Sequence, residues 1–357
     1  MAKFHNIKIA DIYKTTKDCS VITFDIPDEL KSEFQYKPGQ HLTLKATIND
    51  QDVRRSYSLC SSPIENKWKV AVKKINGGLF STFVNENLKK DDVLEIMPPS
   101  GKFNVEINTL KAKNYIAFAA GSGITPILSI IKTHLKSEPN STFKLFYLNR
   151  SVKSIIFKEE IEQLKNVYFN RFEIFHFLTK EHRASELFNG RFTKEKIKVL
   201  TDNIIDIPTT DDCFICGPEE MIFLLRDELS AAGLDKDKIH YELFTSEISE
   251  DDKKRIQKIV ENKVNGTDIT IIDGGKEFHF VMDEAYDNIL DGALAAGADL
   301  PFACKGGVCS TCKCMVIEGE VEMKVNYALD AHEVAKGLVL SCQAVPTTDK
   351  VVVDFGY

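Results

Sequence analysis

The sequence has no apolar run near the length that a membrane-spanning helix requires. Its first residues, Met-Ala-Lys-Phe-His-Asn, lack the apolar core of a secretory signal, so we expect a cytoplasmic protein. The eight histidines are dispersed, and neither a Ser/His/Asp set nor a metal-binding group of histidines stands out. There is also no internal repeat and no low-complexity tract. The composition is that of a globular protein. The sequence does not indicate acid–base catalysis.

Length and charge suggest several domains with different surfaces. At 357 residues the chain exceeds one ordinary hydrophobic core, so two or three domains are expected. The net charge of −7 arises at the C-terminal end, since residues 264–357 contain 15 acidic and six basic side chains. Such an acidic domain suits docking on a basic protein surface and argues against a nucleic-acid partner. An acidic face that only aids solubility explains the same numbers equally well.

Cysteines are concentrated near the C-terminus. Three of the nine follow a C-x4-C-x2-C spacing, and a fourth comes after 29 further residues: Cys304, Cys309, Cys312 and Cys342. This is the plant-type signature for four thiolates on a [2Fe–2S] cluster. Two glycines after Cys304 allow the loop to wrap tightly around one inorganic core. Structural zinc, the main alternative, usually takes two closely spaced pairs, whereas this pattern has a triplet and a single cysteine.

The other cysteines have simpler interpretations, because thiols in a reducing compartment rarely form disulfides. Cys314, two residues past the triplet, is interpreted as a packed or free thiol. Cys213 and Cys216 imitate a redox C-x-x-C motif, but they lie in an apolar, strand-like run. Residues three apart on a strand face opposite sides, so this pair is not expected to form a disulfide.

Short alternating segments separated by turns occupy the N-terminal part. Strands are expected at 4–13, 19–26, 40–48, 54–59, 68–75 and 93–97, which indicates an antiparallel barrel or sandwich. Arg55 is suited to grip a pyrophosphate, and Tyr57 offers a flat face to an aromatic ring system. The turn at Gly77 and Gly78 opens a helix whose N-terminus is favourable for phosphate. Each piece alone is non-specific, because an Arg and a Tyr on one strand usually form only a solvated face.

From residue 114 the pattern changes to strands that alternate with helices. Strands are expected at 115–119, 142–148, 172–178, 213–215 and 240–244, and helices at 127–135, 157–165, 193–199 and 219–232. This alternation predicts a parallel, doubly wound sheet. After the first strand comes Gly121-Ser-Gly123-Ile-Thr125-Pro126, where we expect Thr125 as helix cap and Pro126 at the first helical position. The glycines permit close approach of a pyrophosphate, although proline replaces the third glycine of the general fingerprint.

Two further strand ends carry candidate nucleotide contacts. The second strand ends in Arg150 and Ser151, which suit a 2′-phosphate, whereas NADH favours an acid there. NADPH is therefore the expected electron donor, with NADH as the alternative. The fourth strand ends in Cys216, a small residue that leaves room for a nicotinamide ring. A buried cysteine before a turn is the simpler interpretation of the same residue.

The last part of the chain is predicted to be a small mixed sheet crossed by one helix. Strands are expected at 268–272, 277–282, 314–318, 339–342 and 350–355, with a helix at 289–296 and a hairpin turn at 273–276. Residues 246–264 are charged and weakly periodic, which suggests a linker with at most a helical turn. The expected boundaries are the barrel at 1–106, a nucleotide-binding α/β domain at 107–245, the linker at 246–264 and the domain of the cysteine loop at 265–357; the resemblance described next implies that the barrel binds FAD and that the last domain is a ferredoxin.

In order and spacing, Arg55-Ser-Tyr57-Ser58, the Gly77-Gly78 turn and the Gly-x-Gly-x-x-Pro turn resemble the ferredoxin–NADP reductase family, and the C-terminal part resembles the β-grasp fold of plant-type ferredoxins. The resemblance implies FAD in the barrel, with Arg55 on the diphosphate, Tyr57 on the isoalloxazine and Ser58 near flavin N5. Strict alternation turns Ser58 away from Tyr57, so that role requires a bend or a backbone contact.

The same resemblance implies further residues near the two cofactors. Cys216 is placed beside the site of hydride transfer, and Phe244 either shields the flavin or packs in the core. The remaining residues implied to contact FAD or the nicotinamide nucleotide are Ser56, Val72, Lys73, Ile75, Gly77, Gly78, Ser81, Gly121, Gly123, Thr125, Pro126, Arg150, Ser151, Gly217, Pro218 and Met221.

The whole chain resembles the reductase components of multicomponent oxygenases. A hydride carries two electrons and a [2Fe–2S] cluster accepts one, so a flavin is needed between them. The expected route runs from NADPH through FAD and the cluster to an external protein. The resemblance implies a di-iron oxygenase acting on an aromatic CoA thioester such as phenylacetyl-CoA; steroid, alkane or fatty-acid oxygenases and hybrid-cluster proteins are alternatives. A redox sensor and a zinc-stapled interaction protein also remain open, and both predict no NADPH-driven turnover.

Overall fold

The computed structural model describes residues 3–244 and 250–356. The chain forms a larger N-terminal unit and a smaller C-terminal unit, divided after Phe244, and the short segment Arg54–Ser56 is grouped with the smaller one. Within the described residues, every helix is too short or too polar to cross a membrane.

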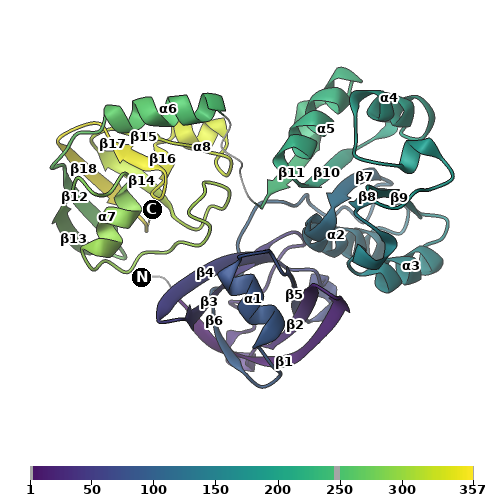
Figure 1. Ribbon diagram of the computed structural model, residues 1–357, viewed down its shortest axis with the longest axis horizontal. Helices are drawn as coiled ribbons and strands as arrows, with labels where there is room; N and C mark the ends of the chain where they lie inside the picture. Colours follow the sequence, from purple (N-terminus) through teal and green to yellow (C-terminus); the bar gives the residue numbers. More distant parts are fainter. Residues whose placement is uncertain (1–2, 245–249, 357) are drawn as a thin grey trace. The chain divides into compact units, whose positions relative to one another are not determined.

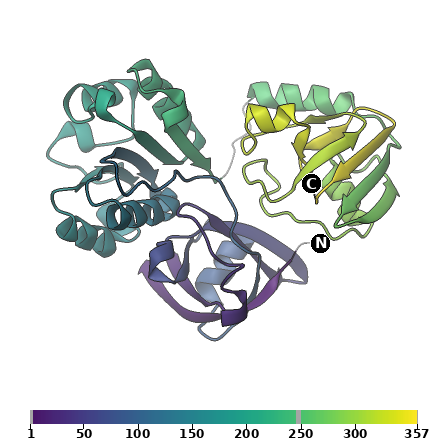
Figure 2. The same ribbon diagram turned by 180° about the vertical axis from the view of Figure 1, so that it is seen from behind.

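The N-terminal part of the larger unit is an antiparallel barrel. Its six strands follow the order β4-β3-β6-β1-β2-β5, and a bridge between Leu59 and Val70 links the two ends of this order. Apolar side chains such as Ile7, Leu44 and Phe80 fill the interior. The elements are β1 (His5–Thr16), β2 (Cys19–Asp25), β3 (His41–Ile48), β4 (Gln51–Ser58), β5 (Trp68–Lys73), β6 (Val93–Ile96) and helix α1 (Leu79–Glu86), which are seen from two sides in Figure 1 and Figure 2. The predicted antiparallel barrel is confirmed.

A parallel, doubly wound sheet follows, as predicted. Its strand order is β11-β10-β7-β8-β9, so the order reverses between β7 and β10, where ligands bind in such sheets. The strands are β7 (Asn114–Ala120), β8 (Thr142–Asn149), β9 (Phe172–Leu178), β10 (Asp212–Gly217) and β11 (Ile239–Leu243). Helices α2 (Ile124–Ser137) and α3 (Lys158–Val167) cover one face, and α4 (Lys194–Asn203) and α5 (Glu219–Ala231) cover the other (Figure 1).

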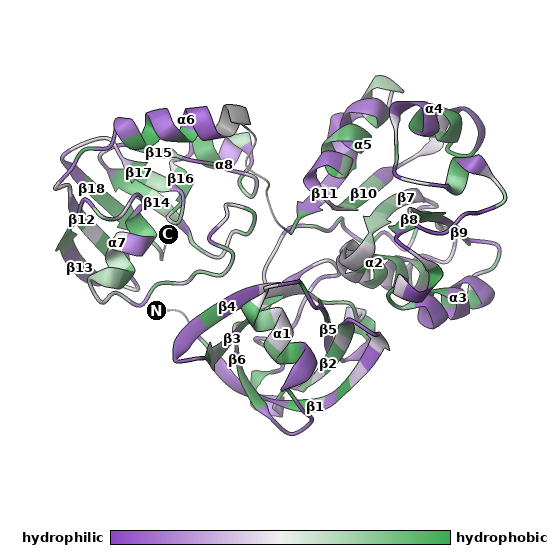
Figure 3. Cartoon of the chain, viewed as in Figure 1, coloured by the Kyte–Doolittle hydropathy of each residue, from purple (hydrophilic) through white to green (hydrophobic). Residues whose placement is uncertain are grey.

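Helices on both faces explain why the central strands β7 and β10 of this sheet are mostly apolar. Along β7, Tyr115 and Ala117 face the core under α2, whereas Phe118 points to the other face and stacks on Phe146 with ring centroids 4.7 Å apart. A strand buried on both sides has no polar alternation, which is the pattern expected for parallel sheets. Figure 3 shows the resulting concentration of hydrophobic residues in the central strands.

Direct contacts join the barrel to helix α2 within the larger unit. The hydroxyls of Ser62 and Thr133 lie 2.8 Å apart and are both buried. Lys132, only 9% exposed, pairs with Glu65 at 3.1 Å. We call these two contacts the barrel–helix seam. Because α2 begins at the turn after β7, the seam ties that turn to the barrel.

The smaller unit is a mixed sheet with short helices, and the predicted β-grasp fold is confirmed. Five strands follow the order β13-β12-β18-β14-β16, and β15 pairs with β17 separately. Helix α7 contributes Ile289, Leu290 and Ala293 to the core. The elements are β12 (Asp268–Asp273), β13 (Lys276–Val281), α7 (Ile289–Ala295), β14 (Lys313–Glu318), β15 (Val321–Met323), α8 (Ala331–Ala335), β16 (Leu338–Leu340), β17 (Ala344–Pro346) and β18 (Lys350–Asp354).

The segment expected as a linker differs from the expectation. Residues 246–249 lie outside the described residues, but 250–261 form the twelve-residue helix α6 (Glu250–Glu261). Ile259 is buried, and Nη2 of Arg255 donates to the carbonyl of Lys324 at 3.0 Å. The expectation of at most one helical turn is therefore wrong, whereas the linker boundaries at 246–264 stay a prediction. The charged residues hid the signal, because only one narrow apolar stripe of this helix packs on the smaller unit.

Candidate active site and metal centre

Tyr57 and Ser58, at the end of strand β4, contact different parts of the larger unit. The ring of Tyr57 packs toward the barrel core, with its centroid 5.8 Å from that of Phe80 on α1. Ser58 is buried, and its hydroxyl donates a hydrogen bond of 3.1 Å to Oε2 of Glu242. Ser56 is half-buried. Ser58 therefore meets a residue of the α/β layer, whereas Tyr57 belongs to the barrel.

The other residues of the expected flavin motif lie on β4 and β5. Arg55 is exposed, and its Nη1 donates to the preceding backbone carbonyl at 2.7 Å. Val72 is fully buried, whereas Lys73 is half-buried with its Nζ 3.9 Å from the carboxylate of Asp18. The same Nζ lies 3.8 Å from the point where Gly121 would carry a Cβ. Lys73 thus places a positive charge beside the first turn of the α/β layer.

The turn before α1 needs glycine and has the shape of an anion cradle. Gly77 has a φ of +75°, and a Cβ on Gly78 would lie 2.6 Å from Oγ of Ser81. The Ser81 hydroxyl accepts from the N–H of Ile75 at 3.1 Å and donates to the Gly78 carbonyl at 3.2 Å. Ile75 itself leaves 62% of its surface exposed, which offers an apolar cover for a bound group. The helix N-terminus behind the turn favours a phosphate.

The Gly-x-Gly turn forms a single 3₁₀ turn that runs directly into α2. Gly121 has a φ of +53°, and its carbonyl accepts a hydrogen bond of 2.9 Å from the hydroxyl of Tyr147. A Cβ on Gly123 would lie 2.1 Å from the carbonyl oxygen of Cys216. The backbone of this turn therefore touches the end of β10, and only glycine permits that approach.

The start of α2 corrects two details of the sequence interpretation. The helix begins at Ile124, with Gly123 in the capping position. Thr125 is already inside the helix, where its hydroxyl donates to the carbonyl of Ser122 at 3.0 Å, and Pro126 is the third helical residue. The expected cap at Thr125 is wrong because the 3₁₀ turn lets the helix begin earlier. Proline is still accommodated, since the first turn of a helix does not use its N–H groups internally.

The end of β10 packs tightly around the Gly-x-Gly turn. Cys216 is fully buried, and burial raises the pKa of its thiol well above the ordinary value. A Cβ on Gly217 would lie 2.5 Å from Cε of Met221, which is itself buried. Pro218 precedes α5 as its capping residue, and Phe244 packs against the core shared with Cys216. The structure thus brings these predicted residues to one place beside the first turn.

Glu242 on β11 was not singled out from the sequence, although it belongs to the same site. It is the register partner of Cys216 in the parallel pair β10–β11. It accepts the hydrogen bond from Ser58, and Nδ1 of His41 lies 3.9 Å from its Oε1. Burial raises the pKa of its carboxyl to about 8, and the bond from Ser58 opposes part of this rise. A carboxyl directly before the apolar Leu243 and Phe244, at the end of β11, is the signal that would have found it.

Replacing Glu242 with glutamine is expected to change how stability depends on pH. The folded pKa lies near 8, above the ordinary value of 4.5, so the folded chain keeps a proton that the unfolded chain releases. The free energy of unfolding therefore falls as pH rises through this window. Glutamine does not ionise, so the free energy of unfolding of the variant does not fall in this way. Relative to the wild type, it should rise by a few kcal/mol between about pH 5 and about pH 8.5. Urea denaturation of both proteins at the two pH values measures the difference in their free energies of unfolding. A difference that does not change with pH would contradict the raised pKa of Glu242.

The end of β8 combines a cation with an unexpected acid. Arg150 is exposed there, and the N–H of Ser151 donates to Oγ of Ser154 at 3.0 Å. Oε2 of Glu181, from the loop after β9, accepts from the N–H of Val152 at 3.0 Å. The sequence interpretation missed Glu181 because it lies about thirty residues later in the chain. A carboxylate at this strand end disfavours a phosphate placed beside it.

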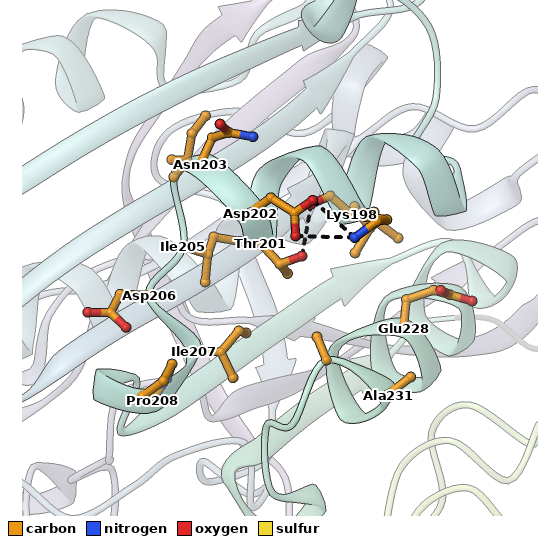
Figure 4. Close-up of a pocket in the computed structure, with 13 residues that line it drawn as sticks. Lys198, Thr201, Asp202, Asn203, Ile205, Asp206, Ile207, Pro208, Glu228 and Ala231 are labelled. Carbon is orange, nitrogen blue, oxygen red and sulfur yellow. Dashed lines mark hydrogen bonds and ion pairs between the residues drawn. The ribbon is translucent and has the colours of Figure 1, made fainter.

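A cavity of about 670 Å³ lies away from these residues, between α4 and α5 (Figure 4). Its lining includes Lys198, Asp202, Pro208 and Glu228, and none of the predicted site residues. The Lys198–Asp202 ion pair, at 3.1 Å, is a solvated pair on one helix face, which contributes little. The cavity is therefore separate from the predicted site.

The cysteine loop of the smaller unit arranges its thiols in two pairs. Sγ of Cys304 and Cys309 are 3.1 Å apart, and Cys312 is hydrogen-bonded to Cys342. The Cys309 thiol and the surrounding backbone N–H groups, including that of Gly306 at 3.4 Å, lower the pKa of Cys304. The Cys312 thiol lowers the pKa of Cys342 in the same way. In each pair the contact between the thiols therefore lowers the pKa of one cysteine, and a thiol must lose its proton to ligate a metal.

This pairing distinguishes between the two metal sites that the sequence left open. Zinc needs four ligands around one centre, whereas a two-iron core takes two thiolates on each iron. Cys314 is fully buried in the core, as are Cys213 and Cys216, and all three are free thiols. The thiol arrangement fits a [2Fe–2S] cluster.

Three family models match successive parts of the chain. They describe an oxidoreductase FAD-binding domain at residues 6–105, an oxidoreductase NAD-binding domain at 118–227 and a 2Fe-2S iron-sulfur cluster binding domain at 271–347. A component of the 1,2-phenylacetyl-CoA epoxidase from Escherichia coli (strain K12) is 41% identical over 99% of this chain and 98% of its own length. The ferredoxin reductase component of 3-ketosteroid-9-alpha-monooxygenase from Rhodococcus rhodochrous is 32% identical over 98% of this chain and 96% of its own.

Solved structures show the same fold. Phthalate dioxygenase reductase matches with a TM-score of 0.61 and 23% identity over 99% of this chain and 98% of its own. An intact type IV self-sufficient cytochrome P450 monooxygenase matches with a TM-score of 0.68 and 21% identity over 98% of this chain and 41% of its own.

The barrel, the doubly wound sheet and the paired thiols define a flavin- and iron–sulfur-dependent reductase that uses a nicotinamide nucleotide. Such proteins pass electrons from the nucleotide to an oxygenase. This chain belongs to the ferredoxin–NADP reductase family, within the three-domain reductase components of oxygenases.

Proposed function

We propose that this chain delivers electrons from NADPH to a di-iron epoxidase acting on phenylacetyl-CoA or a related aromatic CoA thioester. The observation that carries the choice of acceptor is the 41% identity to the Escherichia coli 1,2-phenylacetyl-CoA epoxidase component over nearly the full length of both chains. A steroid monooxygenase is the competing acceptor, supported by 32% identity. A cytoplasmic location belongs to the same proposal, and the free thiols support it because cysteines stay reduced in that compartment.

The acceptor is tested by pairing the purified, cofactor-loaded chain with two oxygenases. One reaction holds the remaining components of the Escherichia coli phenylacetyl-CoA epoxidase with phenylacetyl-CoA. The other holds the oxygenase component of the Rhodococcus 3-ketosteroid-9-alpha-monooxygenase with its steroid. We expect product formation coupled to NADPH consumption in the first reaction only. Coupled turnover with the steroid oxygenase and none with the epoxidase would overturn the proposed acceptor.

The residues of the barrel fit FAD. When bound, FAD accepts a hydride and passes its electrons on singly. Arg55 and the glycine turn before α1 would hold its diphosphate, and the half-buried ring of Tyr57 would offer its open face to the flavin. Val72, Lys73, Ile75 and Ser81 line the same region, with Ser56 on β4. The support is the positive charge of Lys73 and the glycine cradle already described.

Ser58, Glu242 and Cys216 form the proposed site of hydride transfer. The Ser58 hydroxyl holds Glu242 by a bond of 3.1 Å, and burial keeps the Glu242 carboxyl protonated near neutral pH. A neutral carboxyl adds no negative charge beside an incoming hydride. The buried Cys216 thiol is likewise neutral, and its small size leaves room for a flat ring.

The nucleotide is held at the carboxyl ends of the parallel strands. Gly121, Gly123, Thr125 and Pro126 put the start of α2 against the pyrophosphate. Gly217, Pro218 and Met221 line the nicotinamide end, and Phe244 closes it. In the smaller unit, Cys304 and Cys309 hold one iron, and Cys312 and Cys342 hold the other.

Nucleotide preference is predicted to depend on Arg150 with Ser151. Arg150→Ala removes a charge-assisted hydrogen bond to the 2′-phosphate, which lowers kcat/KM for NADPH by about tenfold or more and leaves NADH unaffected. Glu181→Gln removes the opposing charge and raises the preference for NADPH. Steady-state kinetics with both nucleotides measures the effects, with Arg191→Ala as an exposed control. A wild-type preference for NADH, or an unchanged ratio in both variants, contradicts this assignment.

A further inference from the structure

Gln343, the residue after the last cluster cysteine, is buried with only 5% of its surface exposed. Its Nε2 donates to the carbonyl oxygen of Lys305 at 2.9 Å and approaches Sγ of Cys342 at 3.4 Å. A glutamine amide nitrogen carries two hydrogens, so it serves both acceptors at once. One side chain therefore connects the first cysteine loop to the last cysteine.

The backbone around Gln343 is fixed, which gives its amide a defined direction. Its N–H donates to the carbonyl of Leu340 at 2.8 Å, and its carbonyl accepts from the N–H of Lys324 at 3.0 Å. Its Cγ lies 3.3 Å from the point where Gly307 would carry a Cβ. A shorter or branched side chain does not reach the same two acceptors from this position.

The loop that Gln343 holds is strained at Lys305. This residue has a φ of +52°, a left-handed conformation that is unfavourable for a non-glycine residue. The conformation turns the following N–H of Gly306 toward Sγ of Cys304, at 3.4 Å. The Gln343 bond to the Lys305 carbonyl stabilises this turn from the opposite side. It is therefore placed to keep the loop in the shape that the cluster requires.

We propose that Gln343 is a positioning residue with two separable roles, an inference that rests on the proposed ligation of the cluster by the four cysteines. Its first N–H, on the Lys305 carbonyl, maintains the loop and hence the retention of iron. Its second N–H, on the Cys342 thiolate, raises the reduction potential of the cluster. Reduction adds one electron, which increases the negative charge on the sulfurs, so a donor to sulfur stabilises the reduced form. Gln343 thus favours electron transfer from flavin to cluster.

The test uses Gln343→Met in the full-length, cofactor-loaded protein, because methionine keeps the length and removes both donors. Dye-mediated redox titration is expected to show an equilibrium constant for cluster reduction about tenfold smaller, or 59 mV for one electron. The electron paramagnetic resonance signal of the reduced cluster shifts, while the flavin potential and its rate of reduction by NADPH stay unchanged. Gln257→Met, an exposed position on α6, controls for the substitution itself.

A second background separates the two roles. Lys305→Gly relieves the left-handed strain, so Gln343→Met in this background should retain its iron and still lower the potential. An unchanged potential with an intact cluster overturns the tuning role. If Gln343→Met loses its iron both in the wild-type background and in the Lys305→Gly background, Gln343 has only a structural role. That outcome also overturns the tuning role. Absence of the [2Fe–2S] signal from the wild-type protein is a different outcome, because it refutes the cluster ligation itself.

Discussion

Replacing Cys312 with alanine is expected to lower electron delivery to the oxygenase by more than about 100-fold, since one iron loses a thiolate ligand. Flavin reduction by NADPH, followed by stopped-flow absorbance, should remain within about twofold, because no residue of the larger unit changes. The two measurements together separate the cluster from the flavin.

Cys314→Ala is the matched control for this prediction. Cys314 lies two residues from Cys312 and is equally buried, but it belongs to the core and to neither thiol pair. Its loss should reduce stability slightly and leave iron content and electron delivery intact. Equal losses in the two variants would show that the region fails by unfolding. Full activity of the Cys312 variant would show that electrons bypass the cluster.

Gly123→Ala is expected to have the second largest effect, on hydride transfer. The new Cβ would lie 2.1 Å from the carbonyl oxygen of Cys216, a distance that no backbone tolerates, so the turn and the end of β10 must separate. A displacement of about 1 Å at a reacting site costs about 100-fold in rate. Transient kinetics should show this loss in the NADPH-dependent reduction of the flavin.

The control for Gly123→Ala is Gly356→Ala in the smaller unit. A Cβ there would have 3.4 Å to its nearest neighbour, so the same substitution fits. Electron delivery from chemically reduced flavin to the oxygenase should be normal in both variants. A Gly123 variant that reduces its flavin at the wild-type rate would contradict the close contact between the turn and Cys216.

The sequence predicted those parts of the molecule in which chemistry restricts residue type within a short span. The cysteine loop needs thiolates at fixed spacing, and the turns at Gly77 and Gly121 need residues that accept a positive φ. The three folds followed from periodicity, because alternating strands, strand–helix repeats and a short mixed sheet have different patterns.

Other features depend on residues that meet only after folding. Glu242 matters because β10 and β11 lie in register and Ser58 reaches across from the barrel, which no local pattern reveals. Gln343 matters because its side chain returns to a loop 38 residues earlier. Helix α6 was missed because its packing against the smaller unit, through Ile259, outweighs a charged composition. In each case the role or the secondary structure of the residue depends on contacts with residues distant in the sequence, which local composition does not reveal.

The barrel–helix seam has a consequence for selectivity among nucleotides. Ser62 with Thr133, and Glu65 with Lys132, lock the barrel onto the helix that begins at the pyrophosphate turn. If Ser58 and Cys216 flank the hydride-transfer pocket as proposed, its two halves are preassembled during folding, before any substrate arrives. Domain closure is then no source of discrimination between one dinucleotide and another. We therefore expect that discrimination to reside in static recognition of the adenosine moiety, at a distance from the reacting carbon.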